Sequence, residues 1–491
     1  MSCMKKLKFA MIMFMAILLT LSTIPASPAA AAKAASGYIV SPKQVYTYDI
    51  MVRDLQALSE RYPGLIATGS IGTSEYGREL WHIDVGKGPA IILLNGSHHA
   101  REWITTILLM TMADRYALAY VQNAKWGAYS VRDLLDQVTF RFVPMVNPDG
   151  VTLQQKGLAA FPKAERAKLL KMNGGSANFK RWKANAKGID LNRQYPVDWE
   201  GIRNPAPGPS YMNYKGAKPM QAKETQAMIE FTRSSGAELA VAYHSSGEIL
   251  YWNYKTPAEH LSRDRKIANQ YASMTGYRLV KPSANPSGGG FTDWFISQFG
   301  RPGLTPELAR AAGGTNVPLS EWERIWKQHR NTGWMLAAEA AELWLNRQQA
   351  VKVNESVRLT ADERSYQWPN LKSRKLELLY KGRYTALREK GGWLEIATAN
   401  GIRWIPSRMA LKGEYQQPAS LYVAPGPETE MFDSPLSPQP ASLQLADQTV
   451  QVLESWREWF MIKTSKGVLW IRQEEATQAK TADAGSVPHP D

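Results

Sequence analysis

The chain has 491 residues, of which 44% are hydrophobic and 21% are charged, and its formal net charge at pH 7 is +15. A chain of this length can bury the core of a full enzyme domain together with one or two smaller domains. Its one cysteine, Cys3, excludes a disulfide-stabilised scaffold and a thiolate metal site.

Residues 1–32 have the order that is typical of a secretory signal peptide. Three lysines precede an apolar run, residues 9–24, and an alanine-rich tract follows. A membrane anchor is the alternative, but this run is short for a membrane span. Cleavage near Ala32 removes three lysines and no other charge, which lowers the net charge from +15 to +12. We therefore expect a secreted protein, extracellular or cell-wall associated, with no membrane contact after cleavage.

The basic charge that remains favours anionic partners. On an exported bacterial protein, such partners are the polymers of the cell wall. Nucleic acid is the other usual partner of a basic protein, but no recognition motif accompanies the charge, so we expect no nucleic acid. Solubility alone explains the charge about as well as wall binding does.

Strand-like apolar runs alternate with helix-like segments over residues 40–348. Residues 89–95, 138–148 and 237–246 are predicted strands, and each ends in polar or Asn-Pro residues. A long amphipathic helix is predicted over residues 320–349. This alternation predicts an α/β domain in which helices flank both faces of the sheet.

After residue 349 the sequence consists of short β-type runs and contains an internal repeat. The segments "WLEIATANGIRWI" and "WFMIKTSKGVLWI" begin at Trp393 and Trp459 and share six residues at the same places. Each is typical of a β-hairpin whose polar turn ends in glycine. We expect two small all-β modules, residues 352–412 and 416–474, and a disordered polar tail, residues 475–491.

The repeat resembles bacterial Src-homology-3-like domains, which are small barrels common on secreted cell-wall enzymes. The resemblance is carried by the shared tryptophan, glycine and Trp-Ile positions. It implies that the modules bind cell-wall polymers, and the alternative is that they are spacers.

Two adjacent histidines follow the predicted strand at residues 89–95. Metal ligands on adjacent turns need a spacing of about three residues, and this spacing joins His99 to Glu102. From His98 the same spacing leads to Arg101, which cannot bind a metal. The motif alone is weak, because a histidine that is merely hydrogen-bonded at a strand end is the commoner case. Its position helps, since open α/β sheets place ligand sites at the ends of their strands.

A catalytic zinc site needs a third protein ligand and leaves the fourth position open for water. Of the seven histidines, His244 closes the predicted strand at residues 237–246, so it reaches the same kind of sheet edge. Together with His99 and Glu102 it forms a two-histidine, one-carboxylate set that suits zinc.

Residues 46–348 resemble the zinc metallocarboxypeptidases of the carboxypeptidase A type. Six markers occur in the order of that family: "GSHHAREW", "MVNPDG", "GIDLNRQYP", "AYHSSG", "GGGFTDW" and "LTPEL". The resemblance implies a mixed sheet flanked by helices, metallocarboxypeptidase activity, and one Zn²⁺ per chain bound by His99, Glu102 and His244.

The resemblance also implies roles for other residues. Glu307, in "LTPEL", matches the general base of the family, and Arg101 matches an arginine that lines the substrate cleft. Asn192 and Arg193 match the pair that binds the terminal carboxylate of the substrate. A guanidinium group binds a carboxylate with two parallel hydrogen bonds, which suits this role.

Three positions depart from the family pattern. The arginine that stabilises the transition state is replaced by Lys183, so the charge comes from Lys183 or from Arg181. Asn285 stands near the place of the mobile tyrosine of the animal enzymes, and the run Gly288–Gly290 predicts a flexible rim. Thr292 occupies the position that sets side-chain preference, and it indicates neither an apolar nor a basic terminal residue.

Residues 181–196 and 285–295 resemble most the bacterial branch of the family that cuts γ-D-glutamyl–diaminopimelate bonds in peptidoglycan. We therefore predict a secreted zinc carboxypeptidase that hydrolyses peptidoglycan stem peptides at this bond. One alternative is a broad-specificity carboxypeptidase that acts on ordinary peptides. A second alternative is a non-catalytic cell-wall-binding protein.

Overall fold

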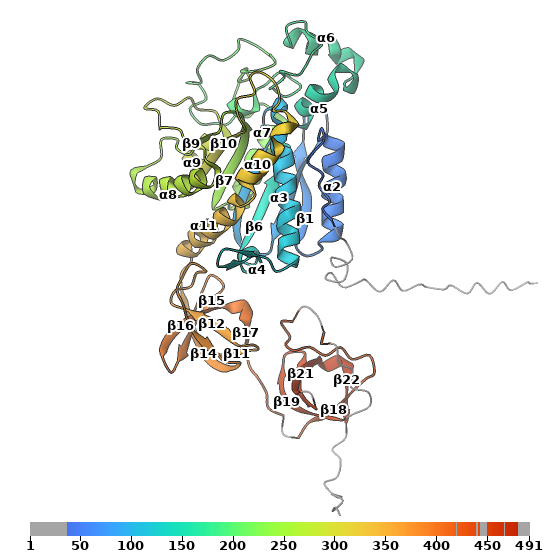
Figure 1. The fold of residues 1–491 in the computed structure, drawn as a ribbon, viewed down its shortest axis with the longest axis vertical. Helices are drawn as coiled ribbons and strands as arrows, with labels where there is room; N and C mark the ends of the chain where they lie inside the picture. Colours follow the sequence, from blue (N-terminus) through green and yellow to red (C-terminus); the bar gives the residue numbers. More distant parts are fainter. Residues whose placement is uncertain (1–36, 419, 438–439, 442–448, 466, 480–491) are drawn as a thin grey trace, which may run out of the picture.

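The computed structural model describes residues 37–418, 420–437, 440–441, 449–465 and 467–479 (Figure 1). The predicted signal peptide, residues 1–32, lies outside the described residues, as does the end of the predicted tail, residues 480–491. Within the described ranges, none of the helices is both long enough and apolar enough to cross a bilayer.

A mixed eight-stranded sheet forms the centre of the larger domain, which confirms the predicted α/β fold. Its strand order is β1-β2-β6-β3-β7-β10-β8-β9. The central pairs β6–β3, β3–β7 and β7–β10 are parallel, whereas β1–β2, β2–β6 and β10–β8 are antiparallel. The strands are β1 (Ile66–Thr73), β2 (Glu79–Gly86), β3 (Ala90–Gly96), β6 (Val138–Val143), β7 (Leu239–Ser245), β8 (Ile249–Tyr251), β9 (Arg278–Leu279) and β10 (Gly303–Leu308).

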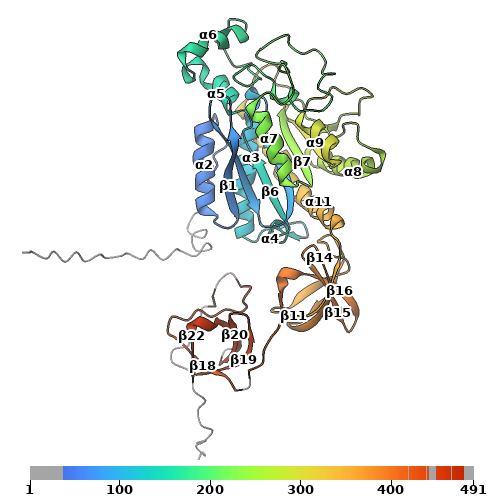
Figure 2. The ribbon, with the colours of Figure 1, turned by 180° about the vertical axis from the view of Figure 1, so that it is seen from behind.

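Helices cover both faces of this sheet (Figures 1 and 2). They are α2 (Tyr48–Arg61), α3 (Ile104–Val121), α4 (Val131–Leu135), α5 (Pro148–Lys156), α6 (Lys163–Met172), α7 (Lys223–Ser235), α8 (Ala258–Thr275), α9 (Phe291–Phe299), α10 (Trp322–His329) and α11 (Thr332–Arg347). On β3, Ile92 and Leu94 pack into one core with α3 and α11, whereas Leu93 packs into a second core with α7 and α9. A strand that is buried on both faces needs an unbroken apolar sequence, and β3 has one.

The prediction of one helix over residues 320–349 is wrong. The structure has two helices, α10 and α11, with a break at Arg330 and Asn331. Gly333, in the first turn of α11, lies so close to Tyr116 of α3 that a Cβ would come within 2.3 Å of the tyrosine hydroxyl. Asparagine and glycine are weak helix formers, so the chain can turn at this point and pack α11 against α3.

Two antiparallel sheets follow α11, with orders β13-β12-β16-β15-β14-β11-β17 and β21-β20-β19-β18-β22. The two repeat hairpins, β15–β16 and β20–β21, are confirmed. Their registers correspond, because Thr398 pairs with Gly401 and Thr464 pairs with Gly467. The resemblance to Src-homology-3-like domains stays a prediction. The strands are β11 (Val351–Leu359), β12 (Glu363–Tyr366), β13 (Lys375–Leu379), β14 (Gly382–Lys390), β15 (Trp393–Thr398), β16 (Gly401–Pro406), β17 (Ala410–Lys412), β18 (Tyr422–Pro425), β19 (Val450–Trp456), β20 (Trp459–Thr464), β21 (Gly467–Arg472) and β22 (Ala476–Ala479).

The prediction that a disordered tail starts at residue 475 is wrong, because residues 476–479 form strand β22. It pairs with β18, from Ala476 opposite Pro425 to Ala479 opposite Tyr422. Its sequence, Ala-Thr-Gln-Ala, lacks the apolar alternation that marks a strand. Backbone pairing with β18 therefore defines a strand that the side-chain pattern does not predict.

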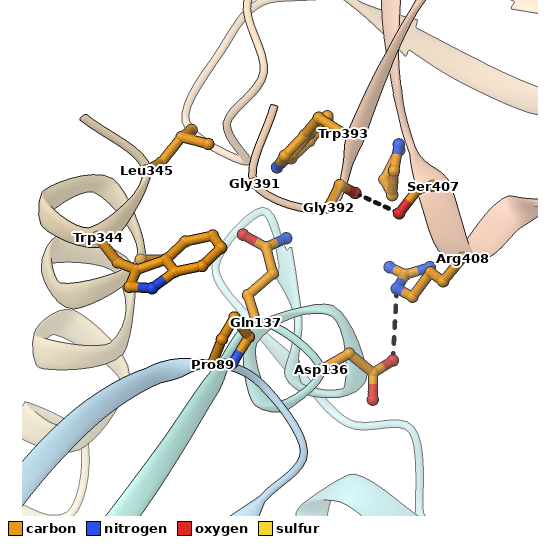
Figure 3. A pocket seen from close by; sticks show the side chains of 12 residues that line it. Pro89, Asp136, Gln137, Trp344, Leu345, Gly391, Gly392, Trp393, Ser407 and Arg408 are labelled. Atoms are coloured by element: carbon orange, nitrogen blue, oxygen red, sulfur yellow. Dashed lines mark hydrogen bonds and ion pairs between the residues drawn. The ribbon is translucent and has the colours of Figure 1, made fainter. Parts of the chain in front are cut away.

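The first β module packs directly against the end of α11 (Figure 3). Trp393 and Trp404 of the module form one apolar cluster with Leu345 of the helix, and Trp344 packs against it. Gly391 approaches α11 so closely that a Cβ there would lie 2.7 Å from both Trp344 Cζ3 and Leu345 Cδ1.

Ion pairs complete this contact. Arg408 pairs with Asp133 and lies 3.4 Å from Asp136, both on the larger domain, and Lys372 pairs with Glu339 of α11 at 2.6 Å. The module is therefore fixed to the larger domain by apolar packing as well as by charge.

The second β module is held to the first by a buried acid. Glu454, which is 6% exposed, accepts hydrogen bonds from Arg358 at 2.7 Å and from Arg383 at 2.9 Å. Trp456 Nε1 donates to the carbonyl of Lys412 at 2.8 Å. A buried carboxylate needs cationic partners, so Glu454 depends on the first module.

Two adjacent glycines test the packing of the first module on α11. Gly391 and Gly392 both have positive φ, +51° and +75°, so alanine strains the backbone at either position. Only Gly391→Ala also brings a Cβ into steric conflict with Trp344 and Leu345. At Gly392 the heavy atom nearest to an added Cβ is 3.9 Å away. We expect Gly391→Ala to lower the free energy of unfolding by about 1–3 kcal/mol more than Gly392→Ala does, measured by denaturant titration. Equal losses would contradict the close packing.

Candidate metal centre and substrate cavity

The carboxyl ends of two parallel strands bring the three predicted metal ligands together. His99 and Glu102 lie in the turn after β3, and His244 lies near the end of β7. In the parallel register Gly96 lies opposite Tyr243, so the residues after both positions emerge at the same edge. One ligand atom from each residue lies within 4.8 Å of the others, and all three residues are buried.

The ligand atoms converge on one point. His99 Nδ1 lies 3.0 Å from Glu102 Oε1, and His244 Nδ1 lies 2.9 Å from Glu102 Oε2. The two Nδ1 atoms are 3.0 Å apart. Two imidazole nitrogens and a carboxylate, with a fourth direction open to a cavity, form the donor set of a catalytic zinc site. The residues present therefore fit one Zn²⁺ ion.

Asp190 orients the first of these histidines. Its Oδ1 lies 3.2 Å from His99 Nε2, and its Oδ2 lies 3.2 Å from Lys183 Nζ. Burial raises the pKa of the Asp190 carboxyl, but Lys183 and His99 outweigh burial and hold this pKa well below its usual range. An ionised Asp190 keeps the His99 proton on Nε2, which leaves Nδ1 free to bind a metal.

His98 is not part of the metal site. Its Nε2 lies 2.7 Å from the hydroxyl of Tyr195, and its ring is fully buried. Burial holds the pKa of His98 well below its usual value, so the ring is neutral. Of the two adjacent histidines, His99 lies in the group that can hold a metal ion, and His98 belongs to the core.

Glu307 lies next to the metal ligands on β10. It is in register with His244 on the neighbouring strand and lines the cavity in front of the ligands. Burial raises the pKa of Glu307 to about 7, against the lowering effect of His244. A carboxylate with this pKa is suited to accept and return a proton near neutral pH.

Asn192 and Arg193 are oriented by other parts of the chain. The backbone N–H of Phe291 donates to Asn192 Oδ1 at 2.9 Å, which leaves the NH₂ group of this amide to donate toward the cavity. Arg193 Nη2 donates to Asn213 Oδ1 at 3.4 Å, and its Nε lies 3.6 Å from Asp190 Oδ2. Both side chains line the cavity, so they offer neighbouring donors to a carboxylate.

Arg181 and Arg101, two of the cations predicted to act in the substrate cleft, do not line the cavity. Arg181 is excluded as an oxyanion-stabilising group, because it donates to Asn173 at 3.1 and 2.7 Å and stacks on Tyr211 at 3.9 Å. Arg101 donates to the carbonyls of Arg181 and Gly314 and does not line the cavity, although its charge lowers the pKa of Glu307. Lys183 lines the cavity, so of Lys183 and Arg181 it is the one placed to stabilise the transition state.

The predicted flexible rim is wrong, because Gly288–Gly290 is buried and closely packed. A Cβ on these glycines would lie 2.4 Å from the Val197 carbonyl, 2.4 Å from Ile202 Cδ1, and 2.8 Å from Asp293 Oδ2, respectively. Asn285 is exposed and does not line the cavity. The glycines are needed for close approach of neighbouring segments, which a sequence pattern cannot distinguish from flexibility.

The cavity in front of the metal ligands has a volume of about 460 Å³. Thr292 is buried in its wall, and its Oγ1 lies 2.6 Å from Thr305 Oγ1. The residues that line it are His99, Lys183, Asp190, Asn192, Arg193, Arg203, Tyr251, Trp252, Asn253, Tyr254, Val280, Lys281, Pro282, Ser283, Pro286, Ser287, Gly288, Gly290, Thr292, Asp293, Thr305 and Glu307.

Asp190 and Tyr251 are among the residues of this site that were not predicted from the sequence. Asp190 stands inside the quoted marker "GIDLNRQYP", and its position two residues before Asn192 was the signal available. Tyr251 ends β8, seven residues after His244, and lines the cavity. Burial raises the pKa of Tyr251, and the carboxylates of Glu307 and Asp293 raise it further, which places this hydroxyl within electrostatic reach of both acids.

Comparisons with known proteins agree with this geometry. A protein-family model described as zinc carboxypeptidase matches residues 51–332. Gamma-D-glutamyl-L-diamino acid endopeptidase 1 of Lysinibacillus sphaericus is 38% identical over 296 residues, which cover 59% of this chain and 72% of that protein. Mast cell carboxypeptidase A of Homo sapiens is 24% identical over 255 residues, which cover 49% of this chain and 57% of that protein.

Among solved structures, thrombin activatable fibrinolysis inhibitor is similar in fold. It aligns with a TM-score of 0.50 and 19% identity, covering 62% of this chain and 77% of that one. At this identity the likeness concerns the fold of the larger domain, and it supports the assignment of the mixed sheet and its flanking helices.

The metal site predicts how zinc content changes in two variants. Glu102→Gln replaces the negatively charged carboxylate between the two histidines by a neutral amide, which is a poor zinc ligand. We therefore expect bound zinc to fall from about one ion per chain to a small fraction. Mass spectrometry of the dialysed protein measures this content. His98→Gln leaves all three ligands in place and should retain the metal. Zinc loss in the His98 variant with retention in the Glu102 variant would contradict the assignment.

Proposed function

Because the chain belongs to the zinc carboxypeptidase family, we propose that it hydrolyses peptidoglycan stem peptides at the bond between γ-D-glutamate and a diamino acid. The observation that carries this proposal is the 38% identity to a gamma-D-glutamyl-L-diamino acid endopeptidase over most of that protein's length. The polar wall of the cavity supports it, since Thr292, Thr305 and Asp293 do not suit an apolar terminal side chain.

The cavity can hold a peptide by its terminal carboxylate. Arg193 and the NH₂ group of Asn192 bind the two carboxylate oxygens, which places the preceding peptide bond in front of His99 and Glu102. A Zn²⁺ ion bound by the three ligands supplies Lewis acidity, which polarises a peptide carbonyl and makes water more acidic.

The chain's own groups move the proton and stabilise charge. Glu307 takes a proton from the attacking water and returns it to the nitrogen of the leaving diamino acid. Lys183 stabilises the negative charge that develops on the carbonyl oxygen, and Asp190 holds the Lys183 ammonium in place at 3.2 Å. These steps consume one water and release one shortened peptide and one free amino acid.

The two alternative functions predicted from the sequence agree with the structure of the site to different degrees. A non-catalytic wall-binding protein does not need a complete ligand set and an acid with a pKa of about 7 beside it, and this chain has both. A broad-specificity carboxypeptidase would use the same ligands and the same base, so only the substrate can separate it from the proposed enzyme.

We expect Glu307→Gln to lower kcat by about 10²- to 10⁴-fold on any cleaved peptide, because the variant keeps the shape of the side chain but cannot accept a proton. Bound zinc should not change, since Glu307 is not a ligand. The matched control is Glu259→Gln, which alters an exposed acid on α8 and should retain full activity. Unchanged hydrolysis by the Glu307 variant would contradict the mechanism.

We also propose that the protein is exported and that its two β modules hold it on the cell wall. The signal-like residues 1–32, the basic charge and the repeated hairpins support this proposal. Removal of residues 413–491, and separately of residues 350–491, should progressively abolish co-sedimentation with purified sacculi while hydrolysis of a soluble stem peptide continues. Undiminished sedimentation of both shortened proteins would show that the modules are not the anchor.

A further inference from the structure

One wall of the substrate cavity carries an acid that the reaction does not use. Asp293, in the first turn of α9, lines the cavity. Over the described residues no lysine, arginine or histidine lies within 4.0 Å of its carboxylate, unlike the carboxylates of Asp190 and Asp198. Burial raises the pKa of Asp293 to about 7, against the lowering effect of a hydrogen bond from the backbone of Gly290 and with a smaller contribution from the charge of Asp198. Asp293 is half-buried, so its carboxylate is partly withdrawn from water without a cation beside it. This is unfavourable, and a cationic group of a ligand would relieve it.

The position of this carboxylate is built into the fold. A Cβ on Gly290 would lie only 2.8 Å from Asp293 Oδ2. The carboxylate can therefore occupy this position because residue 290 is a glycine. Thr292, Thr305 and Tyr251 line the same cavity as Asp293. This part of the cavity is therefore a polar, acidic surface and not an apolar pocket.

The mouth of the same cavity is basic. Arg203 and Lys281 line it from two different loops, and both side chains are exposed. Across the described ranges neither forms an ion pair with an acid within 4.0 Å, in contrast to Arg193 and Lys183, which Asp190 orients. An acid in the wall and two unpaired cations at the mouth favour a ligand that carries both charges.

We propose that Asp293, Arg203 and Lys281 form a subsite for a zwitterionic side chain. Asp293 accepts the side-chain ammonium of a terminal diamino acid, and Arg203 with Lys281 binds the carboxylate on the same carbon. This inference rests on the proposed function, because Asn192 and Arg193 must first bind the α-carboxylate and thereby direct the side chain into this end of the cavity. The subsite distinguishes diaminopimelate from lysine, whose side chain has an ammonium and no carboxylate.

Four γ-D-glutamyl peptides test the subsite, ending in diaminopimelate, lysine, 2-aminopimelate or norleucine. Their side chains carry both charges, the ammonium alone, the carboxylate alone, and neither charge. The quantity measured is kcat/KM for each peptide relative to the norleucine peptide, because this ratio does not depend on the fraction of protein that is folded. We expect the order diaminopimelate first and norleucine last.

Substitutions then assign each charge to its partner. Asp293→Asn should lower the relative kcat/KM of the diaminopimelate and lysine peptides by about 10- to 100-fold and leave the 2-aminopimelate peptide unaffected. Arg203→Gln combined with Lys281→Gln should remove the preference for diaminopimelate over lysine. The control is Glu259→Gln, which alters an exposed acid on α8 outside the cavity, and it should retain the wild-type order.

The outcomes separate this inference from the proposed function. Equal rates for all four peptides, or unchanged kcat/KM ratios in Asp293→Asn, would overturn the subsite while the γ-D-glutamyl activity stands. No hydrolysis of any of the four peptides by the zinc-loaded protein would overturn the proposed function and the subsite with it.

Discussion

The structure depends on the convergence of two imidazole nitrogens and one carboxylate at a single buried point. His99 Nδ1, His244 Nδ1 and Glu102 lie about 3 Å from one another, which is a cation-binding arrangement. It exists because β3 and β7 are parallel neighbours in the middle of the sheet, so the residues after both strands leave at the same edge. The unbroken apolar sequence of β3 and the two cores that cover it are what fix that pairing.

One buried carboxylate connects the metal centre to the substrate cavity. Asp190 lies 3.2 Å from His99 Nε2, 3.2 Å from Lys183 Nζ and 3.6 Å from Arg193 Nε. It therefore orients a metal ligand, the cation proposed for the oxyanion and the cation proposed for the terminal carboxylate. Among the residues that the structure describes, neither Glu307 nor Asp293 has a cation within ion-pair distance, and burial raises the pKa of each to about 7. The cavity thus separates acids held ionised by cations from acids left available to water or to substrate.

Much of this arrangement could be predicted from the sequence, because it follows from periodicity and spacing. The alternation of strands and helices predicted the α/β fold, and the three-residue spacing of His99 and Glu102 selected the histidine that lies in the possible metal-binding group. The exact repeat spacing placed both hairpins in the same register. These features are local, or they follow from the rule that ligands gather at the ends of strands.

Other features depend on contacts between distant residues and could not be predicted in this way. The choice between Arg181 and Lys183 was left open, and it depends on Asn173 and Tyr211, which engage only the first. The packing of Gly288–Gly290 depends on backbone atoms some 90 residues earlier in the chain, such as the carbonyl of Val197. Strand β22 depends on pairing with β18, which no side-chain pattern marks.

The most direct test of the central claim is mass spectrometry of two isomeric tripeptides, L-alanyl-D-glutamyl-diaminopimelate with the γ linkage and with the α linkage. They have the same atoms and charges, so they differ only in the bond offered to the site. With zinc present, the account predicts free diaminopimelate and L-alanyl-D-glutamate from the γ-linked peptide, and no release after chelation. Faster release from the α-linked isomer, or from an ordinary L-peptide while the γ-linked peptide stays intact, would contradict it.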